Sequence, residues 1–321
     1  MRIFLAPYCK SLPVIDLLGG NTQIYQGYTP RISKYIVSSI SNADFVLVPH
    51  DAAFWNSEYL ERVSQIACSH RVVFFNRSDF PKPVNIPHAF SLQNHHSRHQ
   101  LARQIVIPYN IKTPKQRLYR EYRTLPTISF VGYVPHFISG NWIEQIRREF
   151  PHGIYNNPSA IRRIGLRNIK KSKLPNLLLT RDHYGGAKSL INDLVRFREE
   201  YVSSILDSDI VFCPRGSGNS SQRFYEALSM GRIPLIPSSG TVLPFVEGLD
   251  YQDITIHTSL FSHSVLTDVI CFWEEMNQIS YRLLQDRIRE IYRMRLKYTS
   301  YIPELFRALS TRGNIEKFVQ R

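Results

Sequence analysis

Short apolar runs alternate with longer amphipathic stretches along the chain, and this alternation constrains the fold more than any other feature. The run Phe45–Val48, for example, is apolar at every position, which is typical of a strand buried on both faces of a parallel sheet. Strands that alternate with helices form βαβ units. At 321 residues, 43% of them hydrophobic, the chain is large enough for two domains of this kind.

The first half of the sequence predicts four strands, two helices and a connection. We expect strands over Arg2–Ala6, Asp44–Pro49, Arg71–Asn76 and Gln104–Pro108. We expect helices over Arg31–Ser41 and Ser57–Ser69. The polar segment Lys112–Arg123 holds five Lys/Arg and one Glu, and we interpret it as the link between two domains.

The pattern then restarts, so the second half is predicted to form a second parallel sheet. Strands are expected over Thr127–Val134, Leu174–Leu179, Asp209–Cys213, Ile233–Ile236 and Ile254–His257. Helices are expected over Trp142–Phe150, Lys188–Leu206 and Ser221–Met230. From Ser264 the pattern is helical to the end, with a break near Tyr298–Pro303. We predict domains over 1–123 and 124–321, with the last helices packing back on the first domain.

The net charge indicates anionic partners. The chain has 40 Lys+Arg against 26 Asp+Glu, a net charge of +14. Nucleic acid, nucleotides, phosphate esters and an acidic membrane surface all fit such a chain, and charge does not choose among them.

Several classes of protein are excluded early. No apolar run approaches the roughly 18–20 residues that a membrane helix needs, and the first residues do not form a signal-peptide core. The four cysteines are scattered and form no C-x-x-C pair, which argues against a zinc ribbon and a disulfide framework. We therefore expect a cytoplasmic protein, with peripheral contact at the inner face of the membrane left open.

The segment from Asp209 to Ile236 carries the most chemical information. It predicts a strand, a loop of small residues, a helix, a glycine stop at Gly231 and a further strand. Gly216 lets the backbone approach a ligand closely, and Asn219, Ser220 and Ser221 are all good N-cap residues. In an open parallel sheet, ligands bind beyond the carboxyl ends of the strands, where this loop lies. The free N–H groups of a helix N-terminus suit a phosphate.

Three charged residues of this segment complete a candidate anion site. Arg215 and Arg223 add two cations beside the loop, and arginine can hold phosphate oxygens through two hydrogen bonds. Glu226 follows Arg223 by three residues and could accept the hydroxyls of a ribose. The alternative for Glu226 is an i,i+3 surface pair with Arg223, worth about 0.2–0.5 kcal/mol.

The segment resembles the signature of exostosin-type glycosyltransferases. The resemblance lies in Cys213-Pro-Arg-Gly216, in Ser221-Gln-Arg-Phe-Tyr-Glu226-Ala-Leu, in Gly231-Arg-Ile-Pro-Leu235 and in Leu243-Pro-Phe245. It covers about residues 207–257. Arg232 departs from the pattern, since cysteine or another small residue is usual there.

The resemblance implies a fold and a set of roles. The fold is α/β and GT-B-like, with two Rossmann-like domains whose parallel sheets face each other across a cleft, and with a helical C-terminus. Arg215 and Arg223 would contact the diphosphate of a nucleotide sugar, Ser221 would cap the phosphate loop and Glu226 would hold the ribose. Members of the family invert the anomeric carbon, and the fold generally needs no metal and no further cofactor.

An inverting transfer also needs a general base at the end of a strand. Asp51 and His136 are the candidates that we select, and His50, Asp182 and His183 occupy similar positions. Arg181 begins another strand-end loop that could approach the donor, although a plain connection explains the loop equally well.

Other charged clusters have competing interpretations. Asp207-Ser208-Asp209 has the composition of a metal-binding motif, but it precedes a strand, so a turn or cap role is favoured. The histidine cluster over 95–99 is interpreted as a solvated loop. The tract Arg162–Arg181 holds seven cations and no acid, and it is either a solvated face or a surface for nucleic acid, anionic lipid or glycan. It lacks the aromatic residues of nucleic-acid modules. Arg282–Lys297 is predicted to be an amphipathic helix packed on the protein, with membrane contact open.

The leading hypothesis is an inverting hexosyl- or related transferase of polysaccharide biosynthesis. It would move a sugar from a nucleotide diphosphate donor to a hydroxyl of a glycan or a lipid-linked glycan. One alternative is a basic protein that binds nucleic acid or another anionic polymer on a nucleotide-binding fold. Another is a different GT-B enzyme, such as a sugar epimerase.

Overall fold

The computed structural model describes most of the chain, in two compact units. The described residues are 1–6, 9, 12, 35–76, 84, 86, 89–94, 103–112, 119–134, 157–181, 194–216, 218–259, 264–311 and 315–319. The first unit comprises residues 1–110, 242–247 and 294–321, and the second comprises 111–241 and 248–293. The domain boundary expected after residue 123 lies inside the second unit and stays a prediction.

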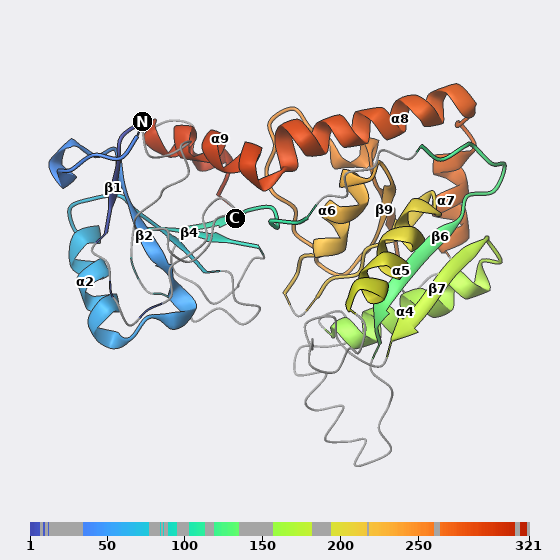
Figure 1. The fold of residues 1–321 in the computed structure, drawn as a ribbon, viewed down its shortest axis with the longest axis horizontal. Helices are drawn as coiled ribbons and strands as arrows, with labels where there is room; N and C mark the ends of the chain where they lie inside the picture. Colours follow the sequence, from blue (N-terminus) through green and yellow to red (C-terminus); the bar gives the residue numbers. More distant parts are fainter. Residues whose placement is uncertain are drawn as a thin grey trace, which may run out of the picture. The chain divides into compact units, whose positions relative to one another are not determined.

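The first unit is built on a five-stranded parallel sheet in the order β1-β2-β3-β4-β5 (Figure 1). The strands are β1 (Ile3–Leu5), β2 (Phe45–Asp51), β3 (Val72–Phe75), β4 (Phe90–Gln93) and β5 (Arg103–Val106). Helix α2 (Ser57–Ala67) begins at the N-cap Asn56, whose side chain accepts a hydrogen bond from the Tyr59 N–H. Tyr59 and Val63 belong to the same apolar core as the side chains of β2 and β3.

Two elements of the first unit differ from the sequence prediction. The helix expected over Arg31–Ser41 is wrong for its described part, since Ile36 forms a parallel bridge with Ile3 and Val37 N–H donates to the Ile3 carbonyl. The β-branched pair Ile36 and Val37 favours this extended backbone. Only a short 3-10 helix, η2 (Ile40–Asn42), follows.

Strand β4 was not predicted from the sequence. Ser91 and Gln93 alternate with apolar residues in it, yet all four residues of the strand are buried. The Gln93 side chain is matched across the sheet by Gln104 of β5, to which its Nε2 donates a hydrogen bond. A polar residue whose partner lies on a neighbouring strand is compatible with a sheet interior, and the sequence alone does not show that partner.

The second unit holds another five-stranded parallel sheet, in the order β10-β9-β8-β6-β7. Its strands are β6 (Ile128–Tyr133), β7 (Asn176–Arg181), β8 (Ile210–Phe212), β9 (Ile233–Pro237) and β10 (Ile256–Thr258). All five overlap the predicted strands. The two parallel sheets and the helical C-terminal part confirm the predicted α/β class.

Helices accompany this sheet along the chain. They are α4 (Pro158–Lys171), α5 (Leu194–Leu206), α6 (Gln222–Ser229), α7 (Ser264–Trp273) and α8 (Gln278–Ile291). Helix α5 packs next to β6, α6 next to β8 and β9, and α7 next to β10. The helix expected over Trp142–Phe150 lies outside the described residues.

Helix α4 was not predicted, although its start signals are present in the sequence. The Asn157 side chain accepts a hydrogen bond from Ala160 N–H, and Pro158 stands at the first helical position. Gly165, which lowers helix propensity, faces the ring of Phe212, and a Cβ there would lie 2.2 Å from that ring. The glycine is therefore a packing requirement rather than a helix stop.

The C-terminal helices break next to the predicted place. A π-helical turn over Tyr292–Leu296 follows α8, and Lys297 then leaves the helical backbone as the N-cap of α9 (Tyr298–Ser310). The break at Lys297 lies one residue before the range Tyr298–Pro303 near which it was predicted, and α9 itself continues through Pro303. Within the described part of the chain, no helix is both long enough and apolar enough to cross a bilayer.

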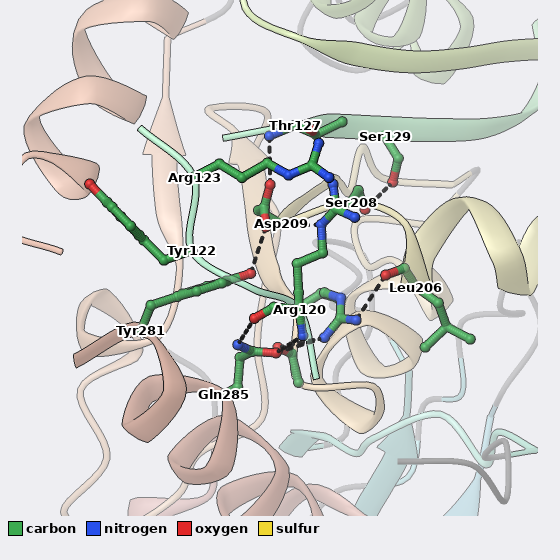
Figure 2. Close-up of polar contacts among 12 residues, drawn as sticks. Arg120, Tyr122, Arg123, Thr127, Ser129, Leu206, Ser208, Asp209, Tyr281 and Gln285 are labelled. Atoms are coloured by element: carbon green, nitrogen blue, oxygen red, sulfur yellow. Dashed lines mark hydrogen bonds and ion pairs between the residues drawn. The ribbon is translucent and has the colours of Figure 1, made fainter. Parts of the chain in front are cut away.

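A buried carboxylate organises the amino ends of the second sheet (Figure 2). Asp209 is fully buried just before β8. It accepts hydrogen bonds from the Thr127 N–H at 2.7 Å and the Tyr281 hydroxyl at 2.9 Å, and it pairs with Arg120 at 3.4 Å. Burial, reinforced by Asp209, raises the pKa of Tyr281, which therefore stays a donor. The sequence predicted a turn or cap role for this Asp-x-Asp motif. In the structure, Asp209 links β6, β8 and α8.

Arg232 holds the helix ends beside this cluster. Its fully buried guanidinium donates to the carbonyls of Ile205 and Leu206 at the end of α5, and to the Met230 carbonyl after α6. Cations stabilise helix C-termini, whose last carbonyls have no partner in the helix. Burial lowers the pKa of Arg232 to about 10, so the group keeps its charge at neutral pH.

We expect Asp209→Ala to lower the free energy of unfolding by about 3 kcal/mol or more, because it strips a buried charge cluster of its carboxylate. Urea unfolding followed by circular dichroism measures the change. The matched control is Asp207→Ala, an exposed position in the same motif, which should stay within about 0.5 kcal/mol of the parent protein. Equally small losses for both substitutions would contradict this role of Asp209.

Candidate functional site

The predicted small-residue loop connects the carboxyl end of β8 to the start of α6. Gly216 N–H donates to the Ser220 carbonyl at 2.9 Å, which closes the loop on itself. Ser221, one of three N-cap candidates in the sequence, is the N-cap of α6, and its side chain makes no capping hydrogen bond within the described residues. Its extended backbone leads directly into the first turn of the helix. The N–H groups of that turn therefore stand next to the loop, where an anion would be stabilised.

Ser220 carries an unused polar group inside the loop. Its side chain is 1% exposed, and its hydroxyl has no hydrogen-bond partner among the residues that the structure describes. A buried hydroxyl without a partner costs free energy, so such a group favours a site that a ligand completes.

Arg215 is held inside the same loop. It is 9% exposed, and its Nε donates to the Gly218 carbonyl at 3.2 Å. Burial lowers the pKa of Arg215, but a guanidinium remains charged at neutral pH. Arg215 thus lies beside the loop, as the sequence predicted.

Arg223, in the first turn of α6, reaches across to the carboxyl end of β6. Its Nη2 donates to the Val131 carbonyl at 2.8 Å, and its guanidinium lies 4.4 Å from the centre of the Phe130 ring. Gly132 makes room for it, since a Cβ there would lie 2.8 Å from Nη2. The Nε of Arg223 is buried and has no partner within the described residues. The side chain is thus fixed in place with hydrogen-bonding capacity left over.

Glu226 is buried, so it does not form the surface i,i+3 pair with Arg223 that was one of its two interpretations. It accepts hydrogen bonds from Arg198 at 3.0 Å, from the Tyr201 hydroxyl and from Gln222 at 3.4 Å. Glu226 is 3% exposed. Burial raises the pKa of Tyr201, and Glu226 adds to the rise while Arg223 opposes it, so the hydroxyl remains a donor.

The sequence did not reveal the partners of Glu226. Arg198 and Tyr201 belong to α5, and their spacing of three residues places them on one face of that helix. This spacing is a visible signal, but nothing in the sequence shows that the face meets α6.

Arg181 ends β7 and lies in register with Tyr133 of β6. Its guanidinium donates to the Phe197 carbonyl at 3.0 Å, pairs with Glu200 at 3.1 Å and stacks 3.3 Å from the centre of the Phe197 ring. Burial lowers the pKa of Arg181, and Glu200 opposes that effect. The described contacts therefore tie this arginine to α5, and its donor role stays a prediction.

Asp51 is the one selected base candidate within the described residues. It ends β2 in the first unit, is 6% exposed, and accepts a hydrogen bond from the Ala53 N–H at 3.2 Å. His50 beside it is fully buried and accepts from the Cys9 N–H at 3.0 Å. His136, Asp182 and His183 lie outside the described residues. The identity of the base stays a prediction.

The described residues offer no clear metal ligand set. Within them, no group of three His, Cys, Asp or Glu side chains could hold an ion. Asp209 of the Asp-x-Asp motif is committed to the buried cluster. The histidines over 95–99 lie outside the described ranges, and metal independence stays a prediction.

One known protein family matches the part of the chain that contains this loop. Residues 149–244 match the family described as the RXYLT1 C-terminal domain. The match includes Arg181, Arg215, Arg223 and Glu226 and covers less than half of the chain. The resemblance to exostosin-type enzymes stays a prediction beside it.

Three solved structures show low similarity to this chain. The catalytic domain of starch synthase IV from Arabidopsis thaliana, bound to ADP and acarbose, is 12% identical, with a TM-score of 0.31, and the match covers 61% of this chain. The spinosyn forosaminyltransferase SpnP is 13% identical (TM-score 0.36), over 84% of this chain and 76% of that protein. A mutant O-GlcNAc transferase from Thermobaculum terrenum is 10% identical (TM-score 0.41), over 99% and 68%. The chain spans 40% of the length of the starch synthase domain.

We expect Tyr201→Phe to lower the free energy of unfolding by about 1–2 kcal/mol, because it removes one donor from a buried carboxylate. Chemical unfolding at neutral pH measures the loss. Arg196→Gln on the same helix is the matched control, since the Arg196–Glu200 pair is exposed and such pairs contribute about 0.5 kcal/mol or less. If the two substitutions had the same effect, Tyr201 would not be needed to satisfy Glu226.

Proposed function

We propose that the chain is an inverting glycosyltransferase that binds a nucleotide diphosphate sugar at the loop between β8 and α6. The observation that carries the proposal is the presence, at one strand end, of two arginines, a helix N-terminus and a buried hydroxyl that has no partner among the described residues. Arg215 and Arg223 would contact the diphosphate, with Gly216, Ser220 and Ser221 lining the phosphate loop. The match of residues 149–244 to the RXYLT1 C-terminal domain family supports this assignment.

Glu226 is proposed to contact the ribose while it holds its protein partners. A carboxylate has about four lone-pair positions, and the described donors from Arg198, Tyr201 and Gln222 use three of them. The fourth would accept a ribose hydroxyl. Arg181 would act from the neighbouring strand end, near the donor sugar or its phosphates.

The reaction would proceed as a single displacement at the anomeric carbon. The oxygen of an acceptor hydroxyl forms the new bond, its proton passes to the general base, and the bond from the anomeric carbon to the phosphate oxygen breaks. The nucleoside diphosphate leaves with the electron pair, and the configuration inverts. Arg215, Arg223 and the α6 N-terminus would stabilise the charge that develops on the leaving diphosphate, so the transfer is proposed to need no metal.

The acceptor is proposed to be a hydroxyl of a glycan or a lipid-linked glycan, with Asp51 as the base and His136 as the second candidate. Asp51 stands at the carboxyl end of a strand, where ligands of parallel sheets bind.

A thermal-shift panel of uridine, guanosine, adenosine, cytidine and thymidine diphosphates tests the donor site. At a nucleotide concentration of 100 times Kd, binding should stabilise the protein by about 2.7 kcal/mol. Arg223→Ala should weaken the binding about 10- to 100-fold, because a charge-assisted hydrogen bond is lost. Arg287→Ala, which removes an exposed arginine paired with Asp253, is the control and should bind normally. Failure of every nucleotide to stabilise the parent protein, with no effect of Arg223→Ala, would refute the assignment.

Asp51→Asn separates catalysis from folding. Asparagine caps a turn as well as aspartate does, so the Ala53 contact should persist, while the loss of a base should slow turnover about 10²- to 10⁴-fold. Release of nucleoside diphosphate in the presence of acceptor glycans measures turnover, and the nucleotide thermal shift should not change. Full turnover would remove Asp51 from the base role, and a loss in His136→Gln would then assign the base to His136.

A further inference from the structure

The second sheet changes its winding direction between β6 and β8. The strand order is β10-β9-β8-β6-β7, so the chain passes from β6 to β7 on one side and returns through β8 on the other. Such a place is a topological switch point, and ligands of open parallel sheets bind outside the carboxyl ends of the strands beside it. The loop between β8 and α6 starts at this switch point, and the end of β6 lies across from it.

The hydrogen-bond ladder between β6 and β8 stops before β6 ends. The last register pair is Ser129 with Val211. The Thr127 carbonyl accepts a hydrogen bond from an N–H of β8, and carbonyls that are an even number of residues apart on a strand point the same way, so the Val131 carbonyl also faces β8. Its partner among the described residues is the Nη2 of Arg223, at 2.8 Å. The arginine side chain thus continues the ladder where the β8 backbone has left it.

Gly132 leaves the space that this guanidinium occupies. A Cβ at this position would lie 2.8 Å from Nη2 of Arg223 and 3.3 Å from the Phe130 ring. Gly132 belongs to strand β6 and does not have the positive φ that favours glycine. Glycine weakens a strand interior, and there it often marks the close approach of another group. The absence of a side chain at this position is therefore explained by Arg223 and not by the backbone.

Of the two neighbours, Arg223 would yield to an added Cβ. Its Nη2 is the far end of a flexible side chain, whereas the Phe130 ring is buried and packs 5.9 Å from the Phe212 ring, between centres. The guanidinium lies 4.4 Å from the centre of the Phe130 ring and 5.8 Å from that of Tyr201. A shift away from Gly132 would break the contact with the Val131 carbonyl and turn the remaining N–H groups of Arg223 to new directions.

We propose that Gly132 is a positioning residue of the donor site, which sets the Arg223 guanidinium where it meets the diphosphate. The inference rests on the proposed function and adds the end of β6 to the loop between β8 and α6. A charge-assisted hydrogen bond holds its nitrogen and oxygen about 2.7–2.9 Å apart, so a guanidinium displaced by a methyl group meets the phosphate oxygens poorly. Gly132 would act on the ligand through Arg223 alone.

Isothermal titration calorimetry of the full chain tests the proposal, with the nucleoside diphosphate that stabilises the parent protein most. Gly132→Ala should weaken binding about tenfold, because the hydrogen bonds of a charged donor are misaligned. The matched control is Gly248→Ala at an exposed glycine with a φ of 71° and no atom within 4 Å of its Cβ. It should lower the midpoint of thermal unfolding through backbone strain and leave the affinity within about twofold of the parent.

The same substitution in an Arg223→Lys background shows whether Gly132 acts through the arginine. Lysine keeps the positive charge but has no Nη2 for the new methyl group to displace. Gly132→Ala should therefore change the affinity of the lysine variant by less than about twofold. An equal loss in both backgrounds would mean that the methyl group acts on the ligand or the fold directly, and it would overturn the proposal.

The parent protein and the single variant separate this inference from the proposed function. If the parent binds a nucleoside diphosphate and Gly132→Ala binds it equally well, the positioning role is wrong and the donor-site assignment stands. If the parent binds no nucleoside diphosphate, the donor-site assignment is wrong and the positioning role is wrong with it.

Discussion

The buried carboxylate of Asp209 is the constraint on which the second unit depends. It is inaccessible to solvent, and it is matched by a backbone N–H, a phenol and a guanidinium from three other parts of the chain. Because a buried charge is tolerated only when it is paired and hydrogen-bonded, these groups must come together for the unit to fold. The contacts tie the start of β8 to the start of β6 and to α8. They set the position from which the short strand β8 leads into the candidate loop.

The cations of the second unit divide by the end of the sheet at which they lie. At the amino ends, Arg120 pairs with Asp209, and Arg232 donates to the carbonyls that end α5 and α6. At the carboxyl ends, Arg215 donates to the Gly218 carbonyl and Arg223 to the Val131 carbonyl, beside the buried Ser220 hydroxyl, which has no partner among the described residues. Arg232, the residue that departs from the exostosin-type pattern, therefore lies among the contacts at the amino ends of the strands. Its departure leaves the proposed donor loop unchanged.

Local signals in the sequence predicted the central elements well, and long-range partners account for what they missed. Ser221 at the N-cap of α6 and Gly231, with a φ of 69°, follow from rules that involve a few neighbouring residues. The burial of Ser91 and Gln93 in β4 depends on a neighbouring strand, and the place of Glu226 depends on α5. Helix α4 was missed although Asn157 and Pro158 marked its start, because Gly165 and the dense basic charge obscured the pattern.

The proposed donor site requires specific contacts between the protein and the phosphates of a bound nucleotide. The most direct test is a crystal structure of the protein with the nucleoside diphosphate that stabilises it most. Phosphate oxygens should lie at about 2.7–3.2 Å from the N–H groups at the start of α6 and from the guanidinium of Arg223, with the Ser220 hydroxyl acquiring a partner. A nucleotide bound elsewhere, with the loop between β8 and α6 unchanged and empty, would contradict the account.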